Sequence, residues 1–372
     1  MRKLMIVSLA LCVCYLTLSV EAYQSRDIEK SFRVASGKKL IIDLKTGGSL
    51  VIRGWDQDQV SIQGDNDDPR NYELDLSEVS EGVRIYSRYV GNRRNYSSNL
   101  KFDVKVPRRF DVSIDTMGGG VTIEGVEGEF TGKTMGGALD LANVKGSARL
   151  TTMGGNITLK NSDLDGSLKT MGGRVLFEDV TGDVKGSSMG GNVVYKNVTS
   201  RSGKSTGDEV HITTMGGSIN VENAPAGANV HTMGGKIHIG SASKFVKAKT
   251  MGGDIKIDSA EGAVEATSMA GDIEVNLTGD GNVTLISFKG DITLVVPAGL
   301  SMEVDIQLAY TQNSSRNFKI ISEFDLKQEE TDQWEYEHGS PRKYIYGRGS
   351  IGGGRNKIRI ETINGNVYLK RG

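Results

Sequence analysis

Side chains suited to proton transfer or metal binding are few, and the best candidates are the histidines at positions 211, 231, 238 and 338. They lack the close spacing of a metal-ligand set. His231 and His238 fall at positions of an internal repeat where other copies carry unrelated polar residues, such as Asp115 and Lys256. We interpret both as surface residues, and we predict no metal site and no catalytic residue.

Two short segments resemble ligand-binding loops without matching one. Ser202-Gly203-Lys204-Ser205 is similar to the end of a phosphate-binding loop, but Val198 stands where that loop needs its first glycine. Asp65-Asn66-Asp67-Asp68-Pro69 offers the oxygen ligands that calcium prefers, without the spacing of a known calcium loop. We interpret the first segment as part of a polar insertion at residues 199–206 and the second as a solvated turn. No cofactor is predicted.

Residues 1–22 are typical of a secretory signal peptide. Arg2 and Lys3 precede an apolar run from Leu4 to Val20, and Ala22 provides the small residue at which cleavage is expected. Both cysteines of the chain, at positions 12 and 14, lie inside this segment. The mature chain therefore has no thiol for catalysis, metal binding or a disulfide. We expect export to the periplasm, the cell surface or the extracellular space, with no transmembrane segment in the mature chain.

The composition argues against a nucleic-acid partner and for many short strands. The chain carries 45 basic and 46 acidic residues, so its net charge of −1 gives no electrostatic footprint for nucleic acid. Glycine is abundant, at 49 of 372 residues, and proline is scarce, at 5. With frequent Val, Ile and Thr, this balance is typical of strands joined by tight turns.

An internal repeat of about 18 residues organises the middle of the chain. Its signature is Thr-Met-Gly-Gly, with Ser-Met-Gly-Gly and Ser-Met-Ala-Gly as variants. The interval between successive methionines is constant, except for a longer step across the insertion and a slightly longer one from the last methionine to Phe288. Fainter copies stand at Thr46-Gly47-Gly48 and Thr362-Ile363-Asn364-Gly365. The repeated methionines are Met117, Met135, Met153, Met171, Met189, Met215, Met233, Met251 and Met269. The repeated glycines are Gly118, Gly119, Gly136, Gly137, Gly154, Gly155, Gly172, Gly173, Gly190, Gly191, Gly216, Gly217, Gly234, Gly235, Gly252 and Gly253.

Aligning the copies on their methionine separates buried positions from exposed ones. The residues four and six places after the methionine, such as Ile157 and Leu159, are apolar in every copy, whereas the residue between them is mostly polar. This alternation predicts a strand with one buried face. A second, looser strand is expected about nine residues later, as at Ala148-Arg149-Leu150.

Two further positions of the repeat, compared across the aligned copies, indicate that equivalent turns stack on one another. Seven residues after the methionine, Lys160, Glu178 and Lys196 alternate in sign, which favours pairing between neighbouring copies. Eight residues after it stand Asn or Asp, which tolerate left-handed φ, so a ladder of such residues, either inward-facing or at a turn, is expected. Its members are Asn143, Asn161, Asp179, Asn197 and Asn223.

One copy of the repeat cannot bury its apolar face alone, so the copies must stack. We predict an all-β fold, a single-chain parallel β-helix or β-solenoid with about 18 residues per rung and atypical β-strand caps. In this interpretation the methionines form an internal ladder and the paired glycines form turns. The predicted organisation is a signal peptide at 1–22, an N-terminal cap with the first irregular rungs at 23–110, a regular solenoid at 111–294 and a C-terminal cap at 295–372.

The order of these motifs resembles a known bacterial family. An opening Gly-Gly-Ser-Leu-Val-Ile-Arg-Gly at 47–54, a Val106-Pro107 lead-in, Gly-Gly rungs and a closing Thr-Ile-Asn-Gly-Asn-Val-Tyr-Leu at 362–369 are similar to the bacterial putative adhesin domain family of unknown function. The resemblance covers nearly all of the mature chain. It implies a right-handed parallel β-helix in the cell envelope or outside the cell, with no catalytic residues to transfer.

The sequence therefore predicts a non-catalytic interaction module that binds a cell-surface polymer or an envelope protein through its repeated lateral face. The family resemblance also allows an envelope-stress or regulatory binding protein. Parallel β-helices include polysaccharide lyases and hydrolases, which need carboxylates or bases clustered in a groove, but here the exposed columns change residue type from copy to copy. Ice binding would need more than one regular threonine column.

Overall fold

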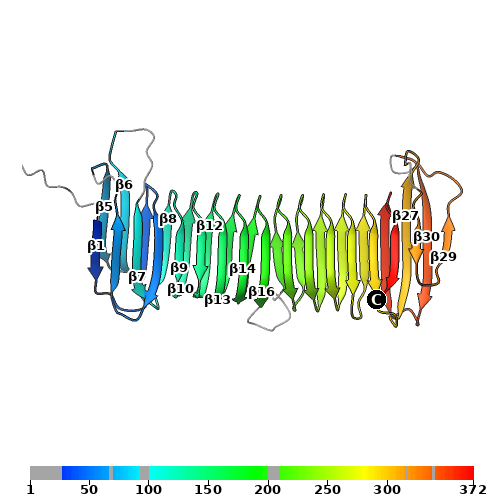
Figure 1. Cartoon of the computed structure of the whole chain (residues 1–372), viewed down its shortest axis with the longest axis horizontal. Helices are drawn as coiled ribbons and strands as arrows, with labels where there is room; N and C mark the ends of the chain where they lie inside the picture. The colour runs from blue at the N-terminus through cyan, green and yellow to red at the C-terminus, as the bar shows by residue number, and fades with distance from the viewer. Residues whose placement is uncertain (1–26, 67–69, 93–99, 200–208, 315–316, 337–339) are drawn as a thin grey trace, which may run out of the picture.

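The computed structural model describes residues 27–66, 70–92, 100–199, 209–314, 317–336 and 340–372, which form an all-β rod (Figure 1). Hydrogen bonds join its 32 strands into one long mixed sheet, and no helix occurs in the described ranges. None of these residues forms a helix that is long and apolar enough to span a bilayer. The signal peptide predicted at residues 1–22 lies outside the described residues.

Two ladders of parallel strands run along the rod, one before and one after the bend at each Thr-Met-Gly-Gly motif. The first ladder contains β8 (Asp111–Thr116), β10 (Glu127–Thr134), β12 (Lys145–Thr152), β13 (Ile157–Thr170), β15 (Val184–Ser188), β17 (Val210–Thr213), β19 (Ala228–His231), β21 (Phe245–Thr250), β23 (Ala263–Ser268) and β25 (Val283–Ser287). The second contains β9 (Val121–Glu124), β11 (Leu139–Ala142), β13 again, β14 (Val175–Thr181), β16 (Val193–Thr199), β18 (Ile219–Ala224), β20 (Ile237–Ala242), β22 (Ile255–Ala260), β24 (Ile273–Leu277) and β26 (Ile292–Val296).

The register of the ladders follows the sequence repeat. Leu139 pairs with Val121 on one side and with Ile157 on the other, so equivalent residues of successive copies are partners. The same register holds across the insertion, where Val193 pairs with Ile219. Internal strands thus pair with a strand on each edge, which satisfies backbone groups that are buried, although across the insertion β15 and β17 share only the Ser187–Thr213 pair.

The predicted buried columns form one continuous core. The residues four and six places after each methionine, such as Ile157 and Leu159, are at most 2% exposed. In the second strand, Ala148 and Leu150 are also buried, at 4% and 1%, and they flank the exposed Arg149. The alternation read from the sequence is therefore confirmed for both strands.

Four of the five members of the Asn and Asp ladder adopt the left-handed φ that the sequence led us to expect, and all four are exposed rather than inward-facing. Asn143, Asn161, Asp179 and Asn197 adopt φ values between 48° and 55°, which these side chains tolerate because they bond to nearby backbone. Asn223 is not among the residues with positive φ.

The methionine column is exposed, so the prediction of an internal methionine ladder is wrong. The inward position at the bend is taken by the preceding Thr or Ser, which is at most 3% exposed in every copy. A hydroxyl can donate and accept hydrogen bonds at the bend, which a buried thioether could not do as well. The exposed fractions are 56% for Met117, 40% for Met135, 41% for Met153, 46% for Met171, 47% for Met189, 49% for Met215, 42% for Met233, 41% for Met251 and 47% for Met269.

Both ends of the rod carry antiparallel strands and one rung that is out of sequence order. At the N-terminal end, β2 inserts between β6 and β8, and β3 inserts between β7 and β9. At the other end, β31 inserts between β25 and β27, and β32 between β26 and β28. The elements at the N-terminal end are β1 (Asp27–Phe32), β2 (Lys39–Leu44), β3 (Ser49–Trp55), β4 (Val60–Asp65), β5 (Tyr72–Val79), β6 (Gly82–Tyr89) and β7 (Lys101–Pro107). Those at the C-terminal end are β27 (Met302–Thr311), β28 (Ile320–Ser322), β29 (Lys327–Glu330), β30 (Arg342–Ile351), β31 (Asn356–Ile363) and β32 (Val367–Arg371).

The fainter copies of the motif belong to these out-of-order rungs. The Thr46-Gly47-Gly48 bend follows β2, and the amide of Gly48 donates to the carbonyl of Gly118 at 3.0 Å. Thr362 lies in β31, and its hydroxyl donates to the carbonyl of Gly290 at 2.8 Å. Both copies therefore stack on the regular repeats as rungs.

Candidate functional site

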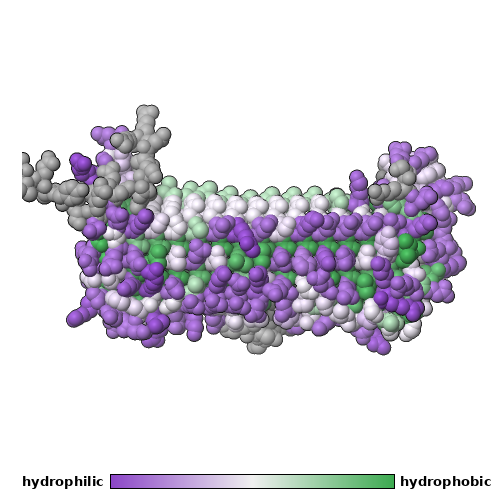
Figure 2. All heavy atoms as spheres, in the orientation of Figure 1, coloured by the Kyte–Doolittle hydropathy of each residue, from purple (hydrophilic) through white to green (hydrophobic). Residues whose placement is uncertain are grey.

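Nine exposed methionines and Phe288 form a single row along one edge of the rod, which we call the methionine ridge. Each ridge residue is one rung from the next, and parallel strands repeat every ~4.8 Å. Phe288 continues the row and is 49% exposed. Its backbone amide donates to the carbonyl of Ser268, just as the amide of Met135 donates to the carbonyl of Thr116. In Figure 2 the ridge is the pale green line along the upper edge, with a near-white band beneath it. A contiguous exposed apolar strip of this kind marks a contact surface.

A repeated hydroxyl network holds the bend that presents each methionine. The Thr152 hydroxyl donates to the carbonyl of Gly137 in the preceding rung, at 2.8 Å, and accepts from the amide of Gly155, at 3.2 Å. The same pair of bonds recurs at Thr170, Thr232 and Thr250. Serine serves equally well at Ser188. Each buried hydroxyl therefore ties its own bend to the rung beneath it.

The two glycines of each motif have different roles. A Cβ at Gly155 would lie 2.0 Å from the carbonyl oxygen of Gly137, so the second glycine is required by close backbone approach rather than by its own φ. A Cβ at Gly154 would meet its nearest atom only at 3.8 Å. This difference explains why Ala270 can replace the first glycine in one copy. All sixteen glycines predicted as turn residues lie at these bends.

The flanks of the ridge are polar and mixed in charge. Lys236 pairs with Asp254 of the next rung at 2.9 Å, and Lys133 lies 3.7 Å from Asp115 of the previous one. These pairs are largely exposed and contribute little to stability. Together with the glycines, they leave the methionines as the outermost apolar atoms of this edge.

Both ends of the rod rise above the ridge. Strand β6 runs on to Tyr89, past Ser87, which pairs with the last residue of β2. Strand β27 runs on to Thr311, past the residue that pairs with the end of β31. The ridge is therefore the floor of a shallow depression between two raised ends (Figures 1 and 2). Aromatic pairs stand at both ends, Tyr72 with Tyr89 at 5.5 Å and Tyr310 with Trp334 at 5.7 Å between ring centroids.

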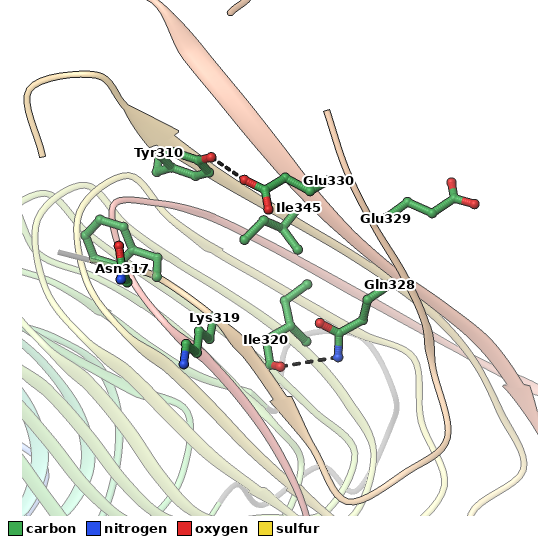
Figure 3. Close-up of a pocket in the computed structure, with 9 residues that line it drawn as sticks. Tyr310, Asn317, Lys319, Ile320, Gln328, Glu329, Glu330 and Ile345 are labelled. Atoms are coloured by element: carbon green, nitrogen blue, oxygen red, sulfur yellow. Dashed lines mark hydrogen bonds between the residues drawn. The ribbon is translucent and has the colours of Figure 1, made fainter. Parts of the chain in front are cut away.

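A second candidate site is a pocket of about 510 Å³ at the C-terminal end of the rod (Figure 3). The Tyr310 hydroxyl donates to Glu330 there, and burial, reinforced by this hydrogen bond, raises the pKa of Tyr310 to about 12. Glu329 points away from Glu330, and a hydrogen bond from Lys327 lowers the pKa of Glu329. The two carboxylates do not converge on one point, as the pair in a glycoside hydrolase must.

The other predicted polar positions behave as surface residues or lie outside the described residues. His238 pairs with Asp258 at 2.7 Å on the rod surface. Glu178 lies between Lys160 and Lys196, at 2.7 and 3.7 Å, and the hydrogen bond from Lys160 lowers the pKa of Glu178. No group of three or more His, Cys, Asp or Glu in the described ranges is arranged to hold a metal. Residues 200–206 of the insertion and Asp67 to Pro69 of the acidic turn lie outside those ranges.

Comparison with protein families identifies the chain. A model of the Toastrack domain, DUF4097, matches residues 176–370, which is more than half of the sequence. The chain belongs to the Toastrack DUF4097 family. This match confirms the family resemblance that the sequence motifs predicted. No curated protein matches this Toastrack chain.

Several solved structures are similar to this Toastrack chain at low identity. A putative adhesin from Parabacteroides distasonis ATCC 8503 is 11% identical, with a TM-score of 0.35, over 73% of this chain and 97% of its own. A putative lipid binding protein from the same strain is 13% identical, with a TM-score of 0.33, over 70% and 98%. A putative adhesin from Parabacteroides merdae ATCC 43184 is 10% identical, with a TM-score of 0.24, over 72% and 98%. Values this low carry no argument about a ligand.

Proposed function

We propose that this Toastrack chain is a non-catalytic interaction module that binds its partner through the methionine ridge. The observation that carries the proposal is the unbroken row of nine methionines and Phe288, each 40–56% exposed. Methionine is flexible and polarizable, and it is common at binding surfaces that must adapt to a partner. Leaving ten large apolar side chains in water disfavours the isolated protein in solution, so a contact that covers them would be favourable.

The proposal includes the finer architecture and the location of the protein. The rod is a right-handed parallel β-helix with about 18 residues per rung, because Leu139 pairs with both Val121 and Ile157 and parallel crossovers are almost always right-handed. The chain is exported through its signal peptide and works in the periplasm, on the cell surface or outside the cell.

The partner is an elongated cell-surface polymer or envelope protein. The ridge is one side chain wide and about ten rungs long, and raised strands bound it at both ends. This shape suits a narrow, extended partner better than a broad globular one. Each rung would add a weak contact, so affinity would grow along the rod, as multivalent contacts do.

The C-terminal pocket gives less support to an enzyme. Tyr310 and Glu330 bond to each other, and a hydroxyl with a pKa of about 12 is a poor base at neutral pH. The pocket lies beside β29 and β30 at one end and does not explain why the ridge repeats along the whole rod.

Cosedimentation of the purified chain with isolated cell-wall polymer and with envelope vesicles tests this proposal. Replacing Met153, Met171 and Met189 with Gln keeps side-chain length but makes the centre of the ridge polar. We expect this triple variant to lose binding by about tenfold or more, since apolar contacts at three adjacent rungs are lost.

The matched control replaces Arg149, an exposed residue of β12 away from the ridge, with Gln. It should bind as the unchanged protein does. Equal binding by the control and by the triple Gln variant, with both folded, would show that the partner contacts another surface.

A further inference from the structure

We propose that the methionine ridge is also a binding site for soft monovalent cations, Cu⁺ or Ag⁺, held by thioether sulfurs of neighbouring rungs. Thioethers are soft ligands that select Cu⁺ over hard cations such as Ca²⁺ or Mg²⁺. The inference rests on the geometry and composition of the ridge, and it holds whichever macromolecule the ridge contacts.

The residues found at each position of the repeat indicate that the ridge position requires the methionine sulfur and not only an apolar side chain. At the buried position four residues after the methionine, the copies exchange Val, Leu and Ile freely, as at Val121, Leu139 and Ile157. At the bend, Thr exchanges with Ser. The ridge position keeps methionine through all nine regular copies, and only the terminal copies replace it, with Phe288 and Ile363. A surface that needed only apolar contact would admit Leu, Ile or Val as readily.

The geometry lets adjacent thioethers share one ion. Neighbouring methionines stand one strand spacing apart, ~4.8 Å, and three rotatable bonds let two sulfurs turn toward a common point. Each side chain is 40–56% exposed, so its sulfur is accessible from solvent. The Gly-Gly segment that follows eight of the nine methionines adds no side chain that could block an approaching ion, and Ala270 after Met269 adds only a methyl group.

The surroundings of the ridge favour a soft ion over a hard one. Carboxylates near the ridge, such as Asp115 and Asp254, are engaged by Lys133 and Lys236 rather than free to collect divalent cations. No multi-ligand set of His, Cys, Asp or Glu competes with the sulfurs in the described ranges. A thioether carries no proton to lose, so binding should depend little on pH between 5 and 8, unlike binding to imidazole.

Silver binding to the full mature chain tests the inference, because Ag⁺ needs no reductant. Equilibrium dialysis against silver nitrate in chloride-free buffer, with bound metal measured by mass spectrometry, gives the stoichiometry. Nine methionines grouped in twos or threes should hold about three or four ions. Zn²⁺ and Ca²⁺, dialysed in parallel, should not bind at the ridge.

The decisive variant replaces all nine ridge methionines with Leu, which keeps the ridge apolar while removing its sulfur. We expect this variant to bind almost no Ag⁺. It should also no longer compete with the chelator bicinchoninate for Cu⁺. A second variant, with Leu only at Met153, Met171 and Met189, remains informative should the ninefold variant not fold. It should lose about a third or more of the bound metal.

The outcomes separate this inference from the proposed function. Leu variants that lose silver yet keep envelope binding support both proposals, since the apolar ridge survives. Silver that stays bound to the Leu variants would overturn the metal site and direct attention to His231 and His238. No silver bound by the unchanged protein would overturn it as well, and the binding function would stand or fall on its own test.

Discussion

At each bend of the rod, two neighbouring residues have opposite environments. Thr152 is fully buried and bonds to two glycines, whereas Met153 next to it is 41% exposed. The bend depends on the hydroxyl, since it satisfies a carbonyl and an amide that face away from water. The methionine contributes little to the fold, so its regular recurrence requires a reason outside stability.

Substitutions at these two positions should therefore have unequal effects. Thr152→Val removes both hydrogen bonds and should lower the free energy of unfolding by about 1–3 kcal/mol. Met153→Asp places a carboxylate in water and should cost under about 1 kcal/mol. Urea unfolding followed by circular dichroism measures both. An internal methionine ladder would demand the reverse order, so a larger loss at position 153 would refute the assignment.

The two glycines of a motif should also differ in their tolerance to substitution. Gly154→Ala introduces a methyl group into open space and should be nearly neutral, as the natural Ala270 indicates. Gly155→Ala forces a Cβ within 2.0 Å of the Gly137 carbonyl and should cost about 1–3 kcal/mol or more. Thermal melts of the two variants provide the comparison, and equal melting temperatures would contradict the close approach described here.

The outward direction of the methionines could have been predicted from the strand that precedes each motif. The second strand has Ala148 and Leu150 inward, and period two carries that face on to Thr152, not to Met153. The prediction of an internal ladder failed because the apolar face of the strand after each motif does not continue back to the methionine across the Gly-Gly bend. It also treated methionine as a core residue, although apolar residues are not confined to the interior.

At the scale of elements, the rungs differ in whether their neighbours in the stack are also their neighbours in sequence. The internal rungs follow chain order and each contacts only the rungs on either side, as in other repeat proteins. The rungs formed by β2 with β3 and by β31 with β32 instead lie between elements that are distant in sequence. The sequence revealed both as faint copies of the motif. Their positions in the stack could not be predicted, because the repeat pattern encodes a rung and not the order of rungs.

Deletions should distinguish these two kinds of rung. Removing residues 134–169 takes out two internal rungs and joins Lys133 to Thr170, which follows the same register. We expect this shorter rod to fold, with a melting temperature lowered by only a few degrees.

Truncation after Arg355 removes fewer residues but should be far more damaging. It eliminates β31 and β32, whose buried Ile358, Ile360, Val367 and Leu369 lie within the core. Four buried aliphatic side chains are worth about 6 kcal/mol or more, and the open strand edges would promote aggregation. If the truncated chain melted at a higher temperature than the internal deletion, the out-of-order rung would be dispensable.

At the scale of the whole molecule, the rod combines a conventional interior with one unusual edge. Its core, hydrogen bonding and exposed ion pairs are those of any stacked β protein, and much of this was predictable from the alternation within each copy of the repeat. The long apolar edge between two raised ends emerges only when the copies are stacked. The ten partly exposed side chains of the ridge together form an apolar surface that no single rung has.

The central claim is that this edge presents nine methionines to solvent in the folded protein. Brief oxidation of the folded chain with dilute hydrogen peroxide, followed by peptide mass spectrometry, measures each thioether separately, because exposed methionines form sulfoxides first. Met302, which is fully buried, is the internal control. The account predicts that all nine ridge methionines oxidise at similar rates and at least about tenfold faster than Met302. Protection of the ridge methionines to the level of Met302 in the isolated, folded protein would contradict it.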